Sequence, residues 1–291
     1  MEMKLQIVHD TLYKFSQEVC LEPHYFRLQP GVTPNISLQS FDLDVSPNPL
    51  SISTQNDCEK NLIQFGWFQG SCNELRIKAK SIVTIKDNNP FDFILFPQSY
   101  LDLPFSYSDQ LIVTLSPSLT GEVVMDELEE YGQNIMIGSD FKTLNFINNL
   151  THQIHQDFKL VYREDGEPHN ANHTFDIKSG SCRDLAWMQI QLLRAMGIAT
   201  KFVSGYFFID SGSSKYELHA WLEVYLPGAG WIGFDPSNGS IAGDHYIPLC
   251  SCASYKDAMP VTGSFRGEAS STLNTSVSIQ VLQKELMGLN P

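Results

Sequence analysis

Cys182 is the residue of this chain best placed to act as a nucleophile. It follows Gly180 and Ser181 and opens the stretch CRDLAWMQIQLLRAMGI, which is apolar around most of a helical circumference. The sequence predicts a buried helix that begins at Cys182 and ends at Gly197, a residue type favoured just after a helix. In a first helical turn the backbone N–H groups lack intrahelical partners, and the dipole favours a thiolate. The same N–H groups can stabilise an oxyanion on an attacked carbonyl.

A thiolate nucleophile needs an imidazole beside it and a third group that orients this imidazole. His219, in the strand-like segment YELHAWLEVYL, and Asp235, at the end of GWIGFD, are the candidates. A tight turn centred near Ala229 would place Asp235 opposite Trp221, with His219 one diagonal step away on the same face. Diagonal neighbours are roughly 7–8 Å apart, within reach of these side chains. The predicted catalytic residues are therefore Cys182, His219 and Asp235.

The segments GSCRDLAWMQIQLLRAMGI and HAWLEVYLPGAGWIGFDPSNG resemble the bacterial transglutaminase-like superfamily, whose core is similar to that of papain-like proteases. Its Cys, His and Asp occur in this chain order and match Cys182, His219 and Asp235. The resemblance covers about residues 140 to 265 of the chain. HDTLYKF and HYFRLQP, nearer the start, resemble the bacterial transglutaminase-like N-terminal region.

The resemblance implies a hydrolase or acyltransferase that acts on peptide, isopeptide or glutamine-type amide bonds through a thioester, with a peptide or protein as substrate. No cofactor is implied. Whether water or an amine accepts the acyl group depends on how the cleft excludes water. We favour hydrolysis by a cysteine protease, with transamidating cross-linking as the alternative. Relatives often carry a Gly-Arg-Asp run where this chain has Cys252-Ala253-Ser254, so its specificity is expected to differ.

The fold class predicted is α+β, in two domains. Over residues 1–125, strand-like runs such as LQIVHDTLYKF, ELRIKAKSIVTIK and QLIVTLSP alternate with turn signals, which favours an antiparallel β-sandwich. Residues 126–291 would form the papain- or transglutaminase-like catalytic domain. There the spacing of apolar residues predicts a helix over 140–158, with Ser139 or Asp140 as its N-cap. Strands are predicted in ATKFVSGYFFID, before a turn at 211–214, and over 270–286.

Other side chains have less specific interpretations. Asp184 and Arg183 fall in the first turn of the Cys182 helix, where Asp stabilises the helix dipole. Glu223 shares the predicted face of His219 and is either a partner of the triad or exposed. Tyr162 could line the site. The three tryptophans are expected to pack in the core or to wall the cleft: Trp187, Trp221 and Trp231.

Histidines and cysteines also raise the question of a metal. His152 and His155 have a spacing that can bind zinc, but no HExxH motif accompanies them, and His169 and His173 lie in and just after a polar loop. A soft-metal cluster of Cys250, Cys252 and His245 would lack a fourth ligand. No metal site is predicted. All six cysteines are expected to be reduced.

The composition excludes some partners. A net charge of −14 and the lack of any Lys- or Arg-rich stretch argue against nucleic acid and anionic membranes. Neither a signal peptide nor a membrane span is recognisable, so a cytoplasmic location is expected. Two other hypotheses stay open: a catalytically silent peptide-binding scaffold, and a binding function of residues 1–125. The sequence does not specify an oligomeric state.

Overall fold

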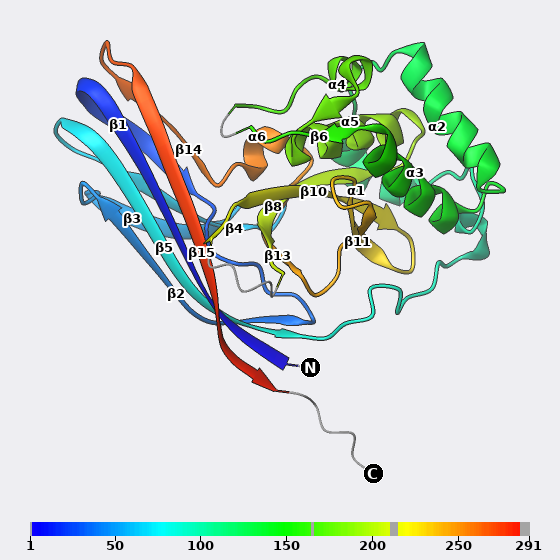
Figure 1. Ribbon diagram of the computed structural model, residues 1–291, viewed down its shortest axis with the longest axis horizontal. Coiled ribbons are helices and arrows are strands. Elements are labelled where there is room, and N and C mark those ends of the chain that lie inside the picture. The colour runs from blue at the N-terminus through cyan, green and yellow to red at the C-terminus, as the bar shows by residue number, and fades with distance from the viewer. Residues whose placement is uncertain (1, 164–165, 210–214, 286–291) are drawn as a thin grey trace.

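The computed structural model describes residues 2–163, 166–209 and 215–285 of the 291-residue chain. Two antiparallel sheets dominate it, and the helices gather on one side of the smaller sheet (Figure 1). The larger sheet contains β1 (Glu2–Phe26), β2 (Ile36–Ser46), β3 (Ser51–Asn56), β4 (Leu62–Trp67), β5 (Cys72–Lys86), β9 (Lys215–Tyr216), β14 (Val261–Arg266) and β15 (Ser271–Glu285). The smaller sheet has the order β12 (Ser240–Ile241), β11 (Gly230–Asp235), β10 (Leu218–Leu226), β8 (Thr200–Phe207), β13 (Tyr246–Cys252).

In the sequence, most of the helices follow the first five strands and precede the strands of the smaller sheet. They are η1 (Gln98–Tyr100), α1 (Asp109–Leu119), α2 (Asp126–Gly138), α3 (Thr143–Asp157), α4 (Ala171–Ile177), α5 (Cys182–Ala195) and α6 (Tyr255–Ala258). Two short strands, β6 (Lys159–Leu160) and β7 (Ser179–Gly180), pair in parallel just before α5. In the described parts of the chain, no helix combines the length and the apolar character needed to cross a membrane.

Strand β1 organises the larger sheet because it is 25 residues long. Its first half pairs with β5 on one side and β15 on the other, and its second half pairs with β4 and β14. The predicted antiparallel pairing is confirmed. Instead of a sandwich of two separate sheets, the N-terminal strands form one curled sheet that is continuous through β1 (Figure 1).

The C-terminal part of the chain returns to this sheet. Strands β14 and β15 pair with β1, from Phe26↔Val261 to Glu2↔Glu285, although both follow the smaller sheet in sequence. The predicted strand over 270–286 is thus present as β15, up to Glu285. Residues 261–285 therefore complete the N-terminal sheet, while the division into domains at residue 125 stays a prediction.

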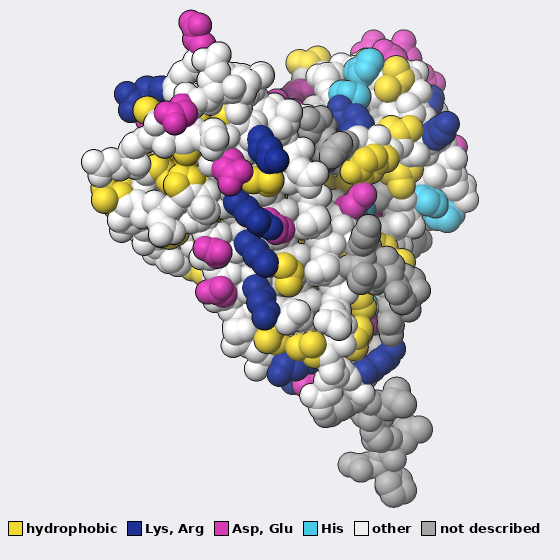
Figure 2. Space-filling model, turned by 60° about the vertical axis from the view of Figure 1, so that its left-hand side comes forward, with side chains coloured by type: hydrophobic (Ala, Val, Ile, Leu, Met, Phe, Trp, Pro, Cys, Tyr) yellow, Lys and Arg dark blue, Asp and Glu magenta, His cyan; other side chains and the backbone are white. Residues whose placement is uncertain are grey.

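The two faces of the larger sheet differ in character. Along β5, the basic side chains Arg76, Lys78 and Lys80 point outwards and alternate with buried apolar residues. Figure 2 shows a row of basic side chains flanked by acidic ones on this outer face. Arg76 pairs with Asp10 of β1 at 2.6 Å, and Asp42 faces Lys80 across the β2–β5 ladder. Acidic neighbours on β1 and β2 therefore offset part of the positive charge of this row.

The inner face of the larger sheet packs against the smaller one. Apolar residues of β1, β5 and β15 share a core with Tyr206, Phe208, Ile247 and Leu249, which lie on or beside β8 and β13. Within this core, His9 Nδ1 and the hydroxyl of Tyr206 form a hydrogen bond of 2.9 Å. The sheets are therefore fixed to one another by buried surface.

The other face of the smaller sheet is covered by α5 and α3. Leu222 and Val224 of β10 meet Leu185, Ile190 and other buried residues of these helices in the second core. Helix α5 ends as predicted: Gly197 has φ +78°, and the N–H of Ile198 donates to the carbonyl of Leu193 at 2.9 Å, which is the Schellman geometry. The nucleophile helix is thus anchored at its far end.

Two element predictions were wrong. The segment QLIVTLSP is not a strand but part of α1, which begins at Asp109 after the N-cap Ser108. A buried stripe at the helical spacing of Leu111, Leu115 and Leu119 outweighs the β-branched residues between them. The helix predicted from residue 140 begins instead at Thr143, because Asp140 and Phe141 have positive φ. The predicted turn at 211–214 lies outside the described residues.

Candidate active site

Cys182 is the first residue of α5, with Ser181 as its N-cap. The preceding Gly180 lies in β7, where a Cβ atom would approach the Cβ of Asp184 to 2.7 Å. Only glycine therefore allows the chain to enter the helix at this angle. The first N–H groups that donate to the start of α5 are those of Asp184 and Leu185. The N–H groups of Cys182 and Arg183 come before them and have no partner within the helix.

The side chain of Asp184 stabilises the N-terminus of α5. Its carboxylate is fully buried and accepts hydrogen bonds from both the N–H and the hydroxyl of Ser181, each at 2.7 Å. It also accepts from the N–H of His169 at 2.7 Å and from the guanidinium of Arg163 at 3.0 Å. The predicted stabilisation of the helix start is present. The carboxylate also ties the segment before α4 to the nucleophile helix.

His219 and Asp235 lie on neighbouring strands in the register that the sequence predicts. The β10–β11 ladder runs from Leu226↔Gly230 to Leu222↔Phe234, so the next position would set Trp221 opposite Asp235. His219 Nε2 and Asp235 Oδ2 are 2.7 Å apart. The remaining ring nitrogen, Nδ1, is then available to Cys182, and the charges of the thiolate and the imidazolium interact. The structure thus brings the three predicted residues together.

Asp235 is fully buried, and other groups besides the imidazole of His219 form hydrogen bonds with it. Oδ1 accepts from the hydroxyl of Ser237 at 2.6 Å and from its N–H at 2.8 Å, and Oδ2 accepts from the side-chain amide of Asn238 at 2.7 Å. The hydroxyl of Tyr246 in β13 donates to Oδ2 at 2.9 Å. These donors fix the carboxylate rotamer and with it the imidazole plane.

The charges of the three residues support one another. Burial disfavours the imidazolium, but hydrogen bonds and charge from Asp235 and Cys182 outweigh it and raise the pKa of His219 to about 10. Burial also disfavours the thiolate, yet the hydrogen bond and positive charge of His219 lower the pKa of Cys182. In the same way, His219 and the hydroxyl donors outweigh burial and lower the pKa of Asp235. The arrangement stabilises a thiolate–imidazolium pair.

Aromatic rings surround the imidazole. The His219 ring centroid lies 5.5 Å from that of Phe207 and 6.2 Å from those of Trp221 and Tyr246. Trp221 crosses over Gly205 of β8, where a Cβ would approach its Cη2 to 2.5 Å. The side chain of His219 is 15% exposed, so one edge of the ring is reachable from solvent.

The other predicted side chains lie away from this centre. Trp187 is buried in the α5 core and Trp231 packs edge-on against Tyr225, so both have a packing role. Glu223 accepts a hydrogen bond from Ser251 at 2.5 Å instead of contacting His219. Tyr162 is 69% exposed.

The four histidines that suggested a metal do not converge. His152 pairs with Gln156, while His169 contacts Arg163 and packs edge-on against His173. Nδ1–H of His155 instead donates to the carbonyl of Ser237 at 2.8 Å, and so supports the turn that holds Asp235. This support was missed because nothing in the helical spacing of His155 indicates a contact with a distant turn.

Sequence reasoning also missed Ser237, Asn238 and Tyr246. The first two follow Asp235 in the run DPSN, where an Asp side chain commonly accepts from the N–H two residues later. That signal was available. Tyr246 reaches Asp235 from another strand, and no local pattern predicts the contact.

Comparison with known proteins agrees with this geometry. Residues 5–84 match the bacterial transglutaminase-like N-terminal region, and residues 131–236 match the transglutaminase-like superfamily. The chain carries a transglutaminase-like core behind a bacterial transglutaminase-like N-terminal region. The matched core includes all three candidate catalytic residues, from Cys182 to Asp235.

Relatives of the transglutaminase-like chain extend over nearly its whole length. The uncharacterized protein Rv2569c of Mycobacterium tuberculosis is 24% identical over 294 residues, covering 95% of this chain and 92% of the relative. The protein-glutamine gamma-glutamyltransferase of Pseudomonas aeruginosa is 33% identical over 70 residues, covering 22% of this chain and 10% of that protein. A crystal structure described as "a Putative Cysteine Protease from Cytophaga hutchinsonii" superposes with a TM-score of 0.74 at 20% identity. It covers 99% of this chain and 93% of that one, and so shares the fold.

Proposed function

We propose that this chain is a transglutaminase-like enzyme that cleaves peptide, isopeptide or glutamine-type amide bonds through a thioester on Cys182. The observation that carries the proposal is the position of Cys182 at the first residue of α5. There it lies close enough to His219 for their charges to interact, and His219 Nε2 in turn lies 2.7 Å from Oδ2 of the buried Asp235. A nucleophile, its base and an orienting carboxylate in this order are what acyl transfer requires.

The proposed reaction begins with attack of the Cys182 thiolate on the substrate carbonyl carbon. The oxyanion that forms lies near the first-turn N–H groups of α5, which can donate to it. The imidazolium of His219 gives its proton to the leaving nitrogen, the C–N bond breaks, and a thioester and a free amine result. Water, deprotonated by the now neutral His219, then attacks the thioester and releases the acid and the thiolate.

Hydrolysis is the acceptor reaction we favour. Transamidation would need a second site that holds an amine against the thioester while water is excluded. The described residues around the triad are aromatic rings and hydrogen-bonded supports, and none of the contacts found there forms a second polar site for an amine. A silent peptide-binding scaffold is the competing function; the complete set of Cys182, His219 and Asp235 favours the enzyme.

The first test is the rate of alkylation of Cys182 by iodoacetamide between about pH 5 and 9, mapped by mass spectrometry. A thiolate–imidazolium pair reacts at a pH where an ordinary thiol, with a pKa of about 8.5, is almost entirely protonated. Cys20 and Cys58 are exposed and serve as internal controls. We expect Cys182 to be labelled at least about tenfold faster than either below pH 7.

The matched variant is His219→Ala, in which the fast labelling should move to high pH. If Cys182 in the parent reacts no faster than Cys20 or Cys58, the enzyme proposal fails and the scaffold takes its place. Incubating the active protein with peptides in the presence and absence of a labelled primary amine then separates the acceptors. Release of free acid alone supports hydrolysis, whereas incorporation of the amine supports cross-linking.

A further inference from the structure

A second cluster of reactive side chains lies at the junction of the two sheets. Cys250 and Cys252 follow one another at alternate positions of β13, and their sulfur atoms are 3.6 Å apart. Asp57, in the loop between β3 and β4, brings Oδ2 to 3.8 Å from the sulfur of Cys252. The two sulfurs and a carboxylate oxygen all lie within 4.8 Å of one another. The three donors come from segments almost 200 residues apart in the sequence.

These distances fit one tetrahedral ion. Zinc binds sulfur at about 2.3 Å and carboxylate oxygen at about 2.0–2.2 Å, which sets tetrahedral edges of roughly 3.8 Å between two sulfurs and roughly 3.5 Å between sulfur and oxygen. The separations of 3.6 Å and 3.8 Å need little adjustment, while the third, between the sulfur of Cys250 and the Asp57 carboxylate, lies within 4.8 Å and would shorten on binding. A fourth ligand can be water or the carbonyl oxygen of Asp257, which is 3.5 Å from the sulfur of Cys250.

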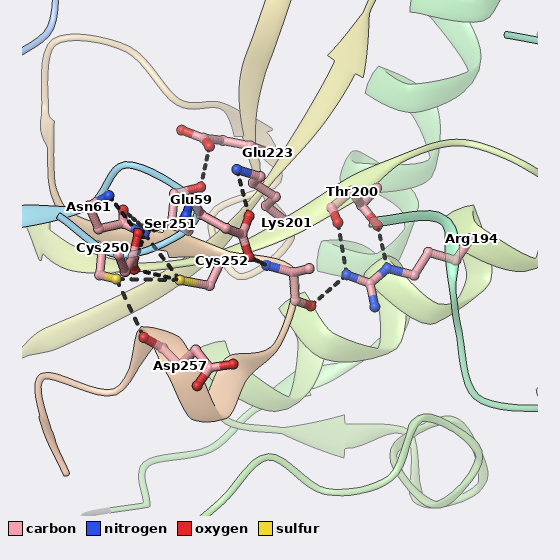
Figure 3. Close-up of polar contacts among 12 residues, drawn as sticks. Glu59, Asn61, Arg194, Thr200, Lys201, Glu223, Cys250, Ser251, Cys252 and Asp257 are labelled. Carbon is pink, nitrogen blue, oxygen red and sulfur yellow. Dashed lines mark hydrogen bonds and ion pairs between the residues drawn. The ribbon is translucent and has the colours of Figure 1, made fainter. Parts of the chain in front are cut away.

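Neighbouring groups already hold the donors in place (Figure 3). Asn61 is the central support: its side chain donates to Asp57 Oδ2 at 2.9 Å and to the carbonyl of Ser251 at 3.0 Å, and accepts from the N–H of Ser251 at 2.9 Å. Asp57 Oδ1 accepts from the N–H groups of Glu59 and Asn61. Such outer hydrogen bonds orient metal ligands and raise their affinity.

Burial and charge favour a cation here. Each cysteine is only 1% exposed, so both sulfur atoms are shielded from bulk solvent. Within the described residues, Asp57 is held by N–H donors and a thiol rather than by a basic side chain, while the nearby Glu59 is paired with Lys201 at 2.7 Å. A bound divalent cation would therefore balance the negative charge of the Asp57 carboxylate.

We propose that Cys250, Cys252 and Asp57 form a binding site for a thiophilic divalent ion of the Zn²⁺ class. Binding replaces both thiol protons, so one ion and two thiols give a dithiolate complex and two protons. The site differs from the cluster that the sequence suggested, because His245 lies instead beside Asp244 and Phe207, and Asp57 takes its place. The ion joins the β3–β4 loop of the larger sheet to β13 of the smaller one.

Ala253, next to Cys252, also contacts the loop, since its N–H donates to Glu59 at 2.8 Å, and its carbonyl accepts from the guanidinium of Arg194 at 2.6 Å. These contacts join the β3–β4 loop and helix α5 to the end of β13 that carries the two cysteines.

Titration with Cd²⁺ tests the proposal, because cadmium thiolates absorb in the ultraviolet. The chain should carry Cys182→Ala, since a thiolate beside His219 would compete for the same ion. We expect one Cd²⁺ per chain, displaced by Zn²⁺, with release of about two protons at a pH where both thiols start protonated. Zn²⁺ should also raise the melting temperature.

The variants Cys250→Ser and Cys252→Ser should each lose the absorption and the thermal shift, and Asp57→Asn should weaken binding about tenfold or more. Cys58→Ser is the matched control, since Cys58 is exposed and adjoins Asp57; it should bind like the parent. Melting without metal shows whether each variant is folded. Binding that survives in a folded Cys250→Ser/Cys252→Ser double variant, or disappears in Cys58→Ser, would overturn the site. So would a parent whose two cysteines, fully reduced, bind no Cd²⁺.

Discussion

At the scale of single residues, the proton shared by Cys182 and His219 decides when the proposed enzyme is active. The pKa of His219 is raised to about 10 and that of Cys182 is lowered, so the ion pair exists between these two values. Below the lower limit the thiolate is protonated, and above the upper one the general acid is lost. The charged pair therefore exists from the lowered pKa of Cys182 up to about pH 10.

We expect kcat/KM for an amide substrate to rise as Cys182 deprotonates, to stay level through neutral pH, and to fall as His219 loses its proton near pH 10. Alkylation of Cys182 should not fall there, because the thiolate persists. Measuring kcat/KM and the alkylation rate as functions of pH on the same preparation separates the deprotonation of Cys182 from that of His219. A kcat/KM profile that falls near pH 6.5, the ordinary value for histidine, would contradict the arrangement.

Tyr246→Phe removes one of the donors to Asp235 without changing the size of the side chain. A hydrogen bond to a charged group contributes about 1.5–3 kcal/mol, so we expect lower stability and about a tenfold loss of kcat with little change in KM. The pKa of Asp235, lowered in the parent, should rise. Because a lowered carboxyl pKa stabilises the fold only above that pKa, acid unfolding should begin at higher pH in the variant.

Tyr107→Phe is the control for this variant. The Tyr107 hydroxyl is also buried and donates to the carbonyl of Tyr225, near the end of β10 opposite to His219. It should lower stability by a similar amount and leave the dependence of kcat on pH unchanged. If both variants lose activity equally, Tyr246 has a merely structural role.

At the scale of elements, helix α5 depends on how it ends as well as on how it begins. Gly197 has φ +78° and open space around its Cα, so the cost of adding a Cβ there is conformational and not steric. We expect Gly197→Ala to destabilise the protein by about 1–2 kcal/mol. Chemical denaturation of the variant and parent measures this difference.

Gly138→Ala provides the comparison. Gly138 also has open space around it but is the last helical residue of α2, so alanine there should be neutral or stabilise by roughly 0.5–1 kcal/mol. Equal losses of stability in the two variants would mean that the destabilisation comes from the position at a helix end and not from the positive φ of Gly197.

The elements that sequence predicted well are those whose pattern is local. The helix from Cys182 to Gly197 has its cap, its apolar surface and its terminating glycine within one segment, and the turn near Ala229 sets the register of β10 and β11 by itself. In α1, by contrast, the local pattern points to a strand. Its helical form depends on packing in one cluster with Ala199, Tyr225 and Trp231, which lie far along the chain from α1.

At the scale of the molecule, the two sheets stabilise each other through one shared core. Tyr206, Phe208, Ile247 and Leu249 of the smaller sheet are buried by the larger one. A fragment of residues 126–291 would expose this surface and leave β14 and β15 without β1. We expect such a fragment to aggregate or to lack a cooperative melting transition, as measured by size-exclusion chromatography and circular dichroism.

A fragment that stays monomeric and melts cooperatively would show instead that the shared core is dispensable. The same long-range character explains what the sequence could not reveal about the sites. Tyr246 reaches Asp235, and Asp57 reaches Cys252, only because separate strands are packed together. Each of these contacts joins segments that no periodicity or motif relates.

The pairing of β1 with β15 also determines the order of events during synthesis. One edge of β1 along its first half, Glu2 to Phe15, is the partner of residues 271–285, which are made long after it. That edge is therefore open while the intervening residues are being translated. Open strand edges recruit other strands, so the nascent protein is expected to need shielding by a chaperone until β15 emerges. Closure over so long a separation also makes the last folding step slow.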